Sequence, residues 1–171
     1  MRLKSEILGD QLRFLCNLTL DNQASLVTMA SAAGSPTVRV ELDRGVSLRA
    51  AHLRRLDWIL EHDGWQALAA GCGYPGRLMG SGADAASRDS SRGRRDCMLT
   101  AWARQMLVEE IAACCSVQEC AIAMGHQQAT QLLGQTLREK HMAARRLVTV
   151  AGYLARRSRA PRPAELHTFD S

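Results

Sequence analysis

The sequence contains few aromatic residues and few prolines. Aromatic side chains make up 4% of the 171 residues, so the core must be built from Leu, Ala, Val, Ile and Met. Chains of this kind favour helix over strand, and the composition therefore predicts an all-α protein. The prolines lie at the edges of the helical segments or beyond them, at Pro36, Pro75, Pro161 and Pro163.

The sequence also lacks long apolar runs. No stretch approaches the roughly 20 apolar residues that a membrane-spanning helix needs. The N-terminal region carries charges at Lys4, Glu6, Asp10 and Arg13, which excludes the apolar core of a signal peptide. We therefore expect a cytoplasmic protein with no membrane partner.

Several catalytic signatures are missing too. The chain has no G-x-S-x-G nucleophile elbow, no P-loop and no G-x-G-x-x-G fingerprint, so nothing indicates nucleophilic catalysis. Its six cysteines form no C-x-x-C pair and fit no zinc motif. Reduced thiols acting as small core residues are the simplest interpretation. A disulfide between Cys72 and Cys97, which bracket a Gly/Ser-rich segment, remains open.

The net charge is +5, and part of the positive excess is concentrated in two places. Neither place is interleaved with aromatic residues, and no nucleic-acid-binding motif is present, so we do not expect nucleic-acid binding. A binding module that uses the basic tail and loop remains an alternative. The arginines are Arg92, Arg94 and Arg95 in the first group and Arg156, Arg157, Arg159 and Arg162 in the second.

Apolar residues recur at helical spacing in four stretches of the chain. Gly34 and Pro36 predict the end of the first stretch, and Gly125 predicts the end of the third. Gly45, inside the second, weakens its helix slightly. The four predicted helices span residues 5–33, 37–62, 97–125 and 127–157.

Residues 63–96 do not follow this pattern. They are rich in glycine and serine and predict a long crossover, with a short helix at residues 65–70. Two helical hairpins joined by a long crossover have ferritin-like connectivity. We therefore predict one ferritin-like antiparallel four-helix bundle over residues 1–157, followed by a flexible basic tail at residues 158–171.

Polar residues interrupt the apolar stripes near the middle of each helix. The first stripe passes through Thr19 and Asn22. His52 lies close to the second stripe, the third passes through Glu109 and Glu110, and the fourth passes through Glu139. Buried carboxylates need a charged partner, a proton or a metal, and ferritin-like proteins supply two metal ions. Alternatively, Glu139 could turn outward and pair with Arg138 or Lys140, and His52 could be a satisfied core histidine.

Short motifs in the same order resemble the ferritin-like stress-response proteins of the bacterial YciE/YciF type. The similarity covers most of residues 5–156 and is nearly gapless up to Leu60. The motifs that carry it are Leu12-Arg13-Phe14-Leu15-Cys16-Asn17, Met29-Ala30-Ser31-Ala32-Ala33-Gly34-Ser35-Pro36, Arg55-Leu56-Asp57, Glu110-Ile111-Ala112, Met124-Gly125-His126, Leu132-Leu133 and Thr136-Leu137-Arg138-Glu139.

This resemblance implies a bacterial protein and a two-metal site that has lost most of its ligands. Only Glu110 and Glu139 keep the carboxylates that the family pattern places on its third and fourth helices. His52 keeps a polar residue one turn beyond the second-helix position. Positions where the resemblance implies acidic residues are instead occupied by Thr19, Leu48, Leu107 and Ala144.

Three hypotheses for function follow. The first is a stress-related ferritin-like protein that is non-catalytic or weakly metal-binding and forms a homodimer. The second is a residual di-iron or di-manganese protein with ferroxidase- or peroxidase-like chemistry. Its ligands would be Glu110, Glu139 and His52, with Glu109 as an auxiliary carboxylate. The third is the basic-tail binding module.

Overall fold

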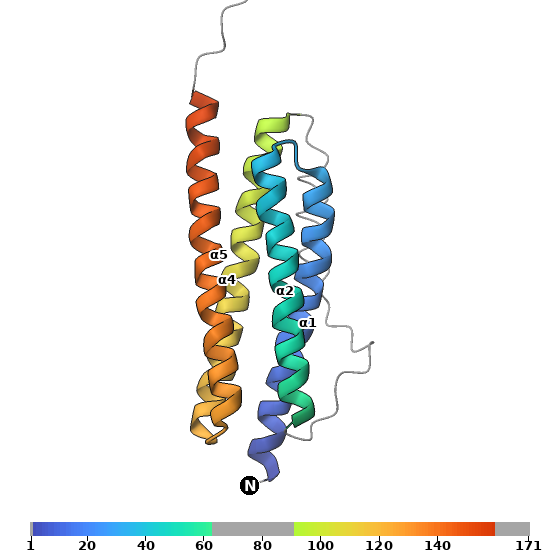
Figure 1. The fold of residues 1–171 in the computed structure, drawn as a ribbon, viewed down its shortest axis with the longest axis vertical. Coiled ribbons are helices and arrows are strands. Elements are labelled where there is room, and N and C mark those ends of the chain that lie inside the picture. The colour runs from blue at the N-terminus through green and yellow to red at the C-terminus, as the bar shows by residue number, and fades with distance from the viewer. Residues whose placement is uncertain (1, 63–90, 160–171) are drawn as a thin grey trace, which may run out of the picture.

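The computed structural model describes residues 2–62 and 91–159. They form four long helices and no strand, so the predicted all-α fold is confirmed (Figure 1). The short helix expected at residues 65–70 lies outside the described residues, as does most of the tail. The helices are α1 (Arg2–Ala32), α2 (Pro36–His62), α4 (Arg92–Ala123) and α5 (Gln127–Arg159).

The helices form an antiparallel bundle with ferritin-like connectivity. Figure 1 shows that α1 and α5 run in one direction and that α2 and α4 run in the other. The most extensive packing is between α4 and α5 and between α1 and α2, while α1–α4 and α2–α5 contacts close the square. Because α2 and α4 are parallel, the chain must return along the bundle between them. The predicted crossover explains this connection.

The start of α4 differs from the prediction. The helix begins at Arg92 rather than at Cys97, so the first arginine group lies on the first helical turns and not in a loop. Arginine is a good helix former, so the arginine-rich end of the segment that was predicted as crossover continues α4 toward its N-terminus. At its other end the bundle extends to Arg159, two residues beyond the predicted end of the fourth helix.

Two glycines at helix ends have different roles. Gly125 has φ +76°, the left-handed conformation expected after a helix, and the prediction for α4 is confirmed there. Gly34 has no such φ, although the first helix ends at Ala32, close to the end that Gly34 and Pro36 predicted. A Cβ at Gly34 would lie 3.2 Å from Cβ of Arg92, so this glycine lets the start of α4 pack against the α1–α2 turn.

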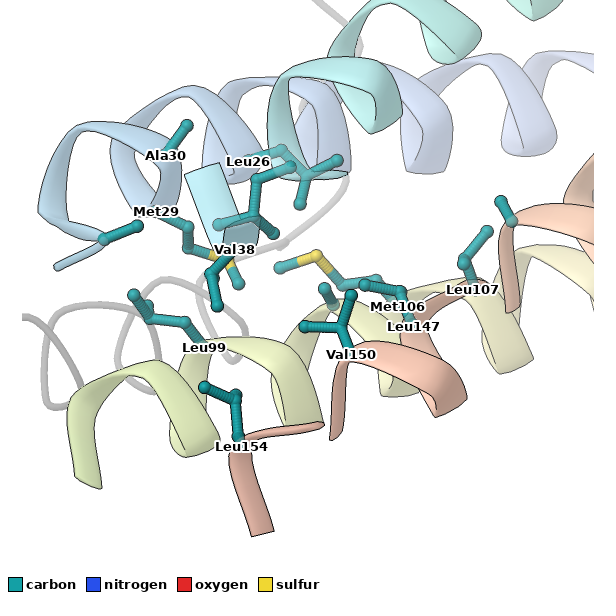
Figure 2. Close-up of a cluster of buried hydrophobic side chains, with 14 residues drawn as sticks. Leu26, Met29, Ala30, Val38, Leu99, Met106, Leu107, Leu147, Val150 and Leu154 are labelled. Carbon is teal, nitrogen blue, oxygen red and sulfur yellow. The ribbon is translucent and has the colours of Figure 1, made fainter. Parts of the chain in front are cut away.

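The bundle interior has two apolar halves. One half, shown in Figure 2, lies toward the α1–α2 turn and includes Leu26, Met29, Leu99 and Leu147. The other lies toward the α4–α5 turn and includes Leu12, Leu15, Ile59 and Leu133. Between them, near the middle of the helices, lie the buried polar residues Thr19, Asn22, Arg49, His52, Glu110, Thr136 and Lys140.

Cysteines Cys16 and Cys114 are buried free thiols in the second apolar half. Burial raises the pKa of both thiols to about 12, so neither is a thiolate at neutral pH, which fits their interpretation as small core residues. Cys97 is an exposed free thiol, so the Cys72–Cys97 disulfide is not formed in this structure; Cys72 itself lies outside the described residues. No helix in the described ranges is long and apolar enough to cross a membrane.

Candidate functional site: a buried ion-pair layer

One side chain from each helix meets at the centre of the bundle. These are Asn22 of α1, Arg49 of α2, Glu110 of α4 and Lys140 of α5, which we call the ion-pair layer. None of them is more than 2% exposed. Two cations pair with one anion here, so the layer keeps a net charge of +1 in the bundle interior, where a charge without a partner is costly.

Glu110 is the centre of the ion-pair layer. Its Oε1 accepts hydrogen bonds from Nδ2 of Asn22 and Nε of Arg49, both at 2.7 Å. Nη2 of Arg49 also lies 2.7 Å from Oε1, at an ion-pair distance but without hydrogen-bond geometry. Nζ of Lys140 donates to the other oxygen, Oε2. Both carboxylate oxygens are therefore occupied by donors from the protein itself.

The charge state of Glu110 follows from two opposing effects. Burial is the larger single effect and by itself would raise the pKa of this carboxyl group. The positive charges of Lys140 and Arg49, together with the hydrogen bonds from Lys140 and Asn22, outweigh burial and hold the pKa below its usual value. Glu110 is thus an anion that is matched by cations on two other helices.

Helical phase explains why these residues point inward. Lys140 lies four residues after Thr136 and three before Ala143, both of which face the core. Arg49 is at the equivalent place on α2, between Leu42 and Leu56. Gly45 lies beside this side chain. A Cβ there would come within 2.9 Å of a methyl group of Leu26, which is too close, and within 3.4 Å of Nη1 of Arg49, which is ordinary contact. The glycine that weakens the helix in isolation therefore makes room for Leu26 of α1.

A second polar cluster lies beside the layer, between α2 and α5. Glu139 accepts two hydrogen bonds from the guanidinium of Arg55, at 2.7 and 2.8 Å. These bonds are the main cause that lowers the pKa of Glu139 to about 2. Nε2 of His52 lies 3.1 Å from Oε2 of Glu139 and, facing a carboxylate, acts as the donor. Glu139 is about one quarter exposed, so this cluster reaches the surface.

His52 is held neutral. Burial is the main cause that lowers its pKa to about 4, and repulsion from Lys140 acts in the same direction. The hydrogen bond and charge of Glu139, with the charge of Glu110, oppose the shift without reversing it. With its proton on Nε2, the ring presents a buried lone pair at Nδ1 that has no hydrogen-bond partner in the described part of the chain.

The pKa of His52 predicts a pH dependence of stability. Between about pH 6.5 and pH 4 the unfolded chain binds a proton at this residue and the folded chain does not, so stability falls as the pH falls through this window. A shift of this size corresponds to about 3.4 kcal/mol in full, of which roughly 2.4 kcal/mol falls between pH 7 and pH 4.5. We expect urea unfolding at pH 7 and pH 4.5 to show this loss, and we expect H52Q to show a clearly smaller one. Equal losses in both proteins would contradict the assignment.

The structure separates the four residues predicted as metal ligands. Glu110 lies in the ion-pair layer, while Glu139 and His52 form the neighbouring cluster with Arg55. Glu109 is only partly buried, and its Oε1 accepts a hydrogen bond from Gln105 at 3.1 Å on the surface of α4. Within residues 2–62 and 91–159, no group of three or more His, Cys, Asp and Glu side chains could hold a metal ion.

A two-metal centre does not fit the residues present. Such a centre needs several carboxylates with free oxygens that converge on the metal ions. Here Glu110 has both oxygens bound by Asn22, Arg49 and Lys140, and the ammonium group supplies positive charge at one of them. Glu139 is likewise engaged with Arg55. We therefore derive no chemistry through a metal ion.

Two basic residues of the layer were missed in the sequence. The fourth stripe was traced through Glu139, whereas the buried phase is one residue later and passes through Lys140. Arg49 lay within the second stripe but was not singled out. One feature of the sequence could have identified Lys140 as buried. Positions 133, 136, 140, 143 and 147 form an unbroken series at helical spacing on α5, and all except Lys140 are apolar or small.

Comparisons with known proteins agree with this fold and with the resemblance seen in the sequence. Residues 4–160 match the family described as Domain of unknown function (DUF892). The crystal structure of the E. coli stress protein YciF is similar with a TM-score of 0.83 at 18% identity, over 91% of this chain and 99% of that one. A search of the curated proteins found no match.

Two other solved structures share the fold. YcfI from Rhodopseudomonas palustris, for which a structural role has been proposed, gives a TM-score of 0.79 at 21% identity and covers 86% of this chain and 94% of its own. A protein from Xanthomonas campestris gives a TM-score of 0.70 at 15% identity, over 92% of this chain and 99% of that one. At these identities the likeness is one of fold.

Proposed function

Because the chain belongs to the DUF892 family and has the fold of the stress protein YciF, we propose that it is a non-catalytic ferritin-like protein with a stress-related role. In this proposal the ion-pair layer takes the place of a two-metal centre. One observation carries the proposal: the buried Glu110 is matched by Lys140 and Arg49 with Asn22, and each of its two oxygens already accepts a hydrogen bond from the protein.

The physical argument concerns charge compensation in the core. In a metal centre, positive metal ions compensate buried carboxylates, and the apoprotein keeps uncompensated acids. In this chain an ammonium and a guanidinium group supply the positive charge as part of the polypeptide. The bundle can then fold to its final state without loading a metal, and its stability does not depend on the metal supply. Such a protein acts through its surface rather than through redox chemistry.

Metal analysis tests this proposal. We expect protein purified from cells grown in iron- and manganese-rich medium to contain well below one metal ion per chain, because both oxygens of Glu110 already accept hydrogen bonds from the protein. One or two tightly bound ions per chain would reject the proposal and favour the residual metal site. In that case the double variant E110A/E139A should lose the metal. The variant E109Q should keep it if Glu109 is only an auxiliary carboxylate and not an essential ligand.

The remaining expectations from the sequence stay predictions. A homodimer would have a solution mass of twice 18.7 kDa, which light scattering can measure. The cytoplasmic location and the bacterial origin likewise remain part of the proposal.

A further inference from the structure

The first arginine group and the two members of the second group whose side chains the structure describes, Arg156 and Arg157, lie at one end of the bundle. We call this the arginine end and define it as residues 30–40, 91–98 and 152–157. It includes the α1–α2 turn, the start of α4 and the last turns of α5, in the upper part of Figure 1. Its charged residues are Arg39, Arg92, Arg94, Arg95, Arg156 and Arg157, against Asp96 alone.

The one acidic side chain of this end is buried and is not part of its exposed surface. Asp96 is 3% exposed, and its Oδ1 accepts a hydrogen bond from the backbone N–H of Gly34 at 2.9 Å. Two of the arginines have structural roles, since Arg39 and Arg95 donate to the last carbonyl groups of α1. These bonds cover the negative end of the α1 dipole, which would otherwise oppose anion binding.

A pocket at the arginine end is framed by arginines from both groups. It has a volume of about 350 Å³, and Arg92 and Arg157 line it from α4 and α5. The α1–α2 turn forms another wall, at Gly34 and Ser35, and the nearly buried Asp96 also lines the pocket. Arg92 and Arg157 are exposed, and Arg157 reaches across one turn to donate to the hydroxyl of Tyr153 at 3.3 Å. Guanidinium groups in this setting can bind phosphate oxygens through two parallel hydrogen bonds.

The opposite end of the bundle has the reverse charge. Over residues 2–13, 56–62 and 117–130 it carries five exposed acidic residues against three basic ones, Arg2, Lys4 and Arg13. The electrostatic field of a polyanion would orient a bundle with this charge distribution so that its arginine end faces the polyanion. The acidic residues are Glu6, Asp10, Asp57, Glu61 and Glu119.

We propose that the arginine end binds the phosphate backbone of duplex nucleic acid, independently of base sequence. The arginine chemistry favours phosphate, and the arrangement offers no recognition element for bases. Binding of single strands usually adds stacked aromatic side chains, and membrane-surface binding adds inserted Trp, Phe or Leu. In the described part of this end, the exposed large apolar residues are Val40 and Tyr153 only. Nucleic-acid binding was not expected from the sequence, because the arginines are not interleaved with aromatic residues and form no binding motif, and the basic-tail module stood only as an alternative. The fold adds that Arg92 and Arg157, about sixty positions apart, line one pocket.

Binding of the full chain to a labelled duplex of about 20 base pairs, measured by fluorescence anisotropy, tests the proposal. We expect affinity to fall with salt, with a logarithmic slope of about 0.9 for each phosphate contact. The double variant R92Q/R157Q should bind roughly 10- to 100-fold more weakly at about 0.1 M salt and should lower the slope by about 2. Arg92 and Arg157 are exposed, so their removal should leave the helical content and thermal midpoint unchanged.

The matched control is R13Q/R54Q. It also removes two positive charges, but from residues that lie outside the arginine end. We expect the affinity of this control for the duplex to stay within about twofold of the wild type. Direct contacts with phosphate, rather than the net charge of the protein, set both the affinity and its dependence on salt. Equal weakening by both double variants would overturn the proposal. So would absence of binding by the wild-type chain at about 50 mM salt. The proposal would also be overturned if the chain bound phosphatidylserine vesicles more tightly than the duplex. Salt-sensitive self-association of the chain without duplex binding would overturn it as well.

Discussion

The variant E110Q is expected to lower the free energy of unfolding by about 3–5 kcal/mol. The substitution keeps the shape of the side chain but removes the only negative charge of the ion-pair layer. Lys140 and Arg49 would then be buried near each other without an anion, at 1–2% exposure. For a chain of this length the loss corresponds to a fall in thermal midpoint of roughly 10 °C. Urea unfolding and calorimetry measure both quantities.

Two comparisons separate this effect from other causes. The variant E109Q changes the neighbouring carboxylate, which is on the surface, and should cost less than about 0.5 kcal/mol. The triple variant E110L/K140M/R49M removes all three charges together and should recover most of the stability, because well-packed apolar side chains often replace a buried ion pair without loss. A loss below about 1 kcal/mol in E110Q would contradict a fully buried charge network.

The variant K140E is expected to have an effect at least as large and to create a dependence on metal. It places a second carboxylate beside Glu110, so the buried charge is reversed and only Arg49 remains to compensate it. We expect a loss of about 4–5 kcal/mol in the absence of metal. Added Mn²⁺ should restore part of it, about 2.7 kcal/mol at a concentration of 100 times its Kd, because the ion binds only the folded chain.

Thermal unfolding with and without Mn²⁺ measures this dependence. The thermal midpoint of K140E should rise by roughly 5–10 °C with the metal, and that of the wild type should stay unchanged. The variant K140Q serves as the control, since it removes the ammonium group without adding a carboxylate and should not respond to the metal. If K140E without metal were as stable as the wild type, Lys140 would not be the counter-charge of Glu110.

The fold could be predicted from the sequence because its determinants are local and repeated. Apolar residues at helical spacing predict the four helices, and Gly125 marks the end of α4 with the expected left-handed φ. The start of α4 was misjudged by five residues, since helix starts depend on short signals that tertiary contacts easily override. Here the contact between Gly34 and Arg92 accompanies the earlier start.

The candidate site was predicted only in part. The sequence indicated a polar layer at mid-bundle, and Asn22, His52 and Glu110 are buried there. It could not show which cations would meet Glu110, because a lysine or an arginine at the edge of a stripe normally extends to solvent. A rotation of one residue in helical phase decides whether Glu139 or Lys140 faces the core. That rotation is fixed by how all four helices pack together.

The layer also explains how a bundle with a polar centre keeps one register. Each of its hydrogen bonds joins two different helices, so a one-turn slip of any helix would leave a buried charge unmatched. The two apolar halves supply most of the burial energy but are built from interchangeable side chains such as leucine and alanine. We therefore assign stability mainly to the apolar halves and register mainly to the ion-pair layer.

A crystal structure of the protein grown with Mn²⁺, with anomalous scattering recorded near the manganese edge, would show whether the bundle core holds a metal. We expect no anomalous peak between the four helices. We also expect Nζ of Lys140 within hydrogen-bond distance of one oxygen of Glu110, and Arg49 with Asn22 at the other oxygen. A peak at coordination distance from Glu110, with Lys140 turned away, would contradict the proposal that a lysine and an arginine stand where a two-metal centre would lie.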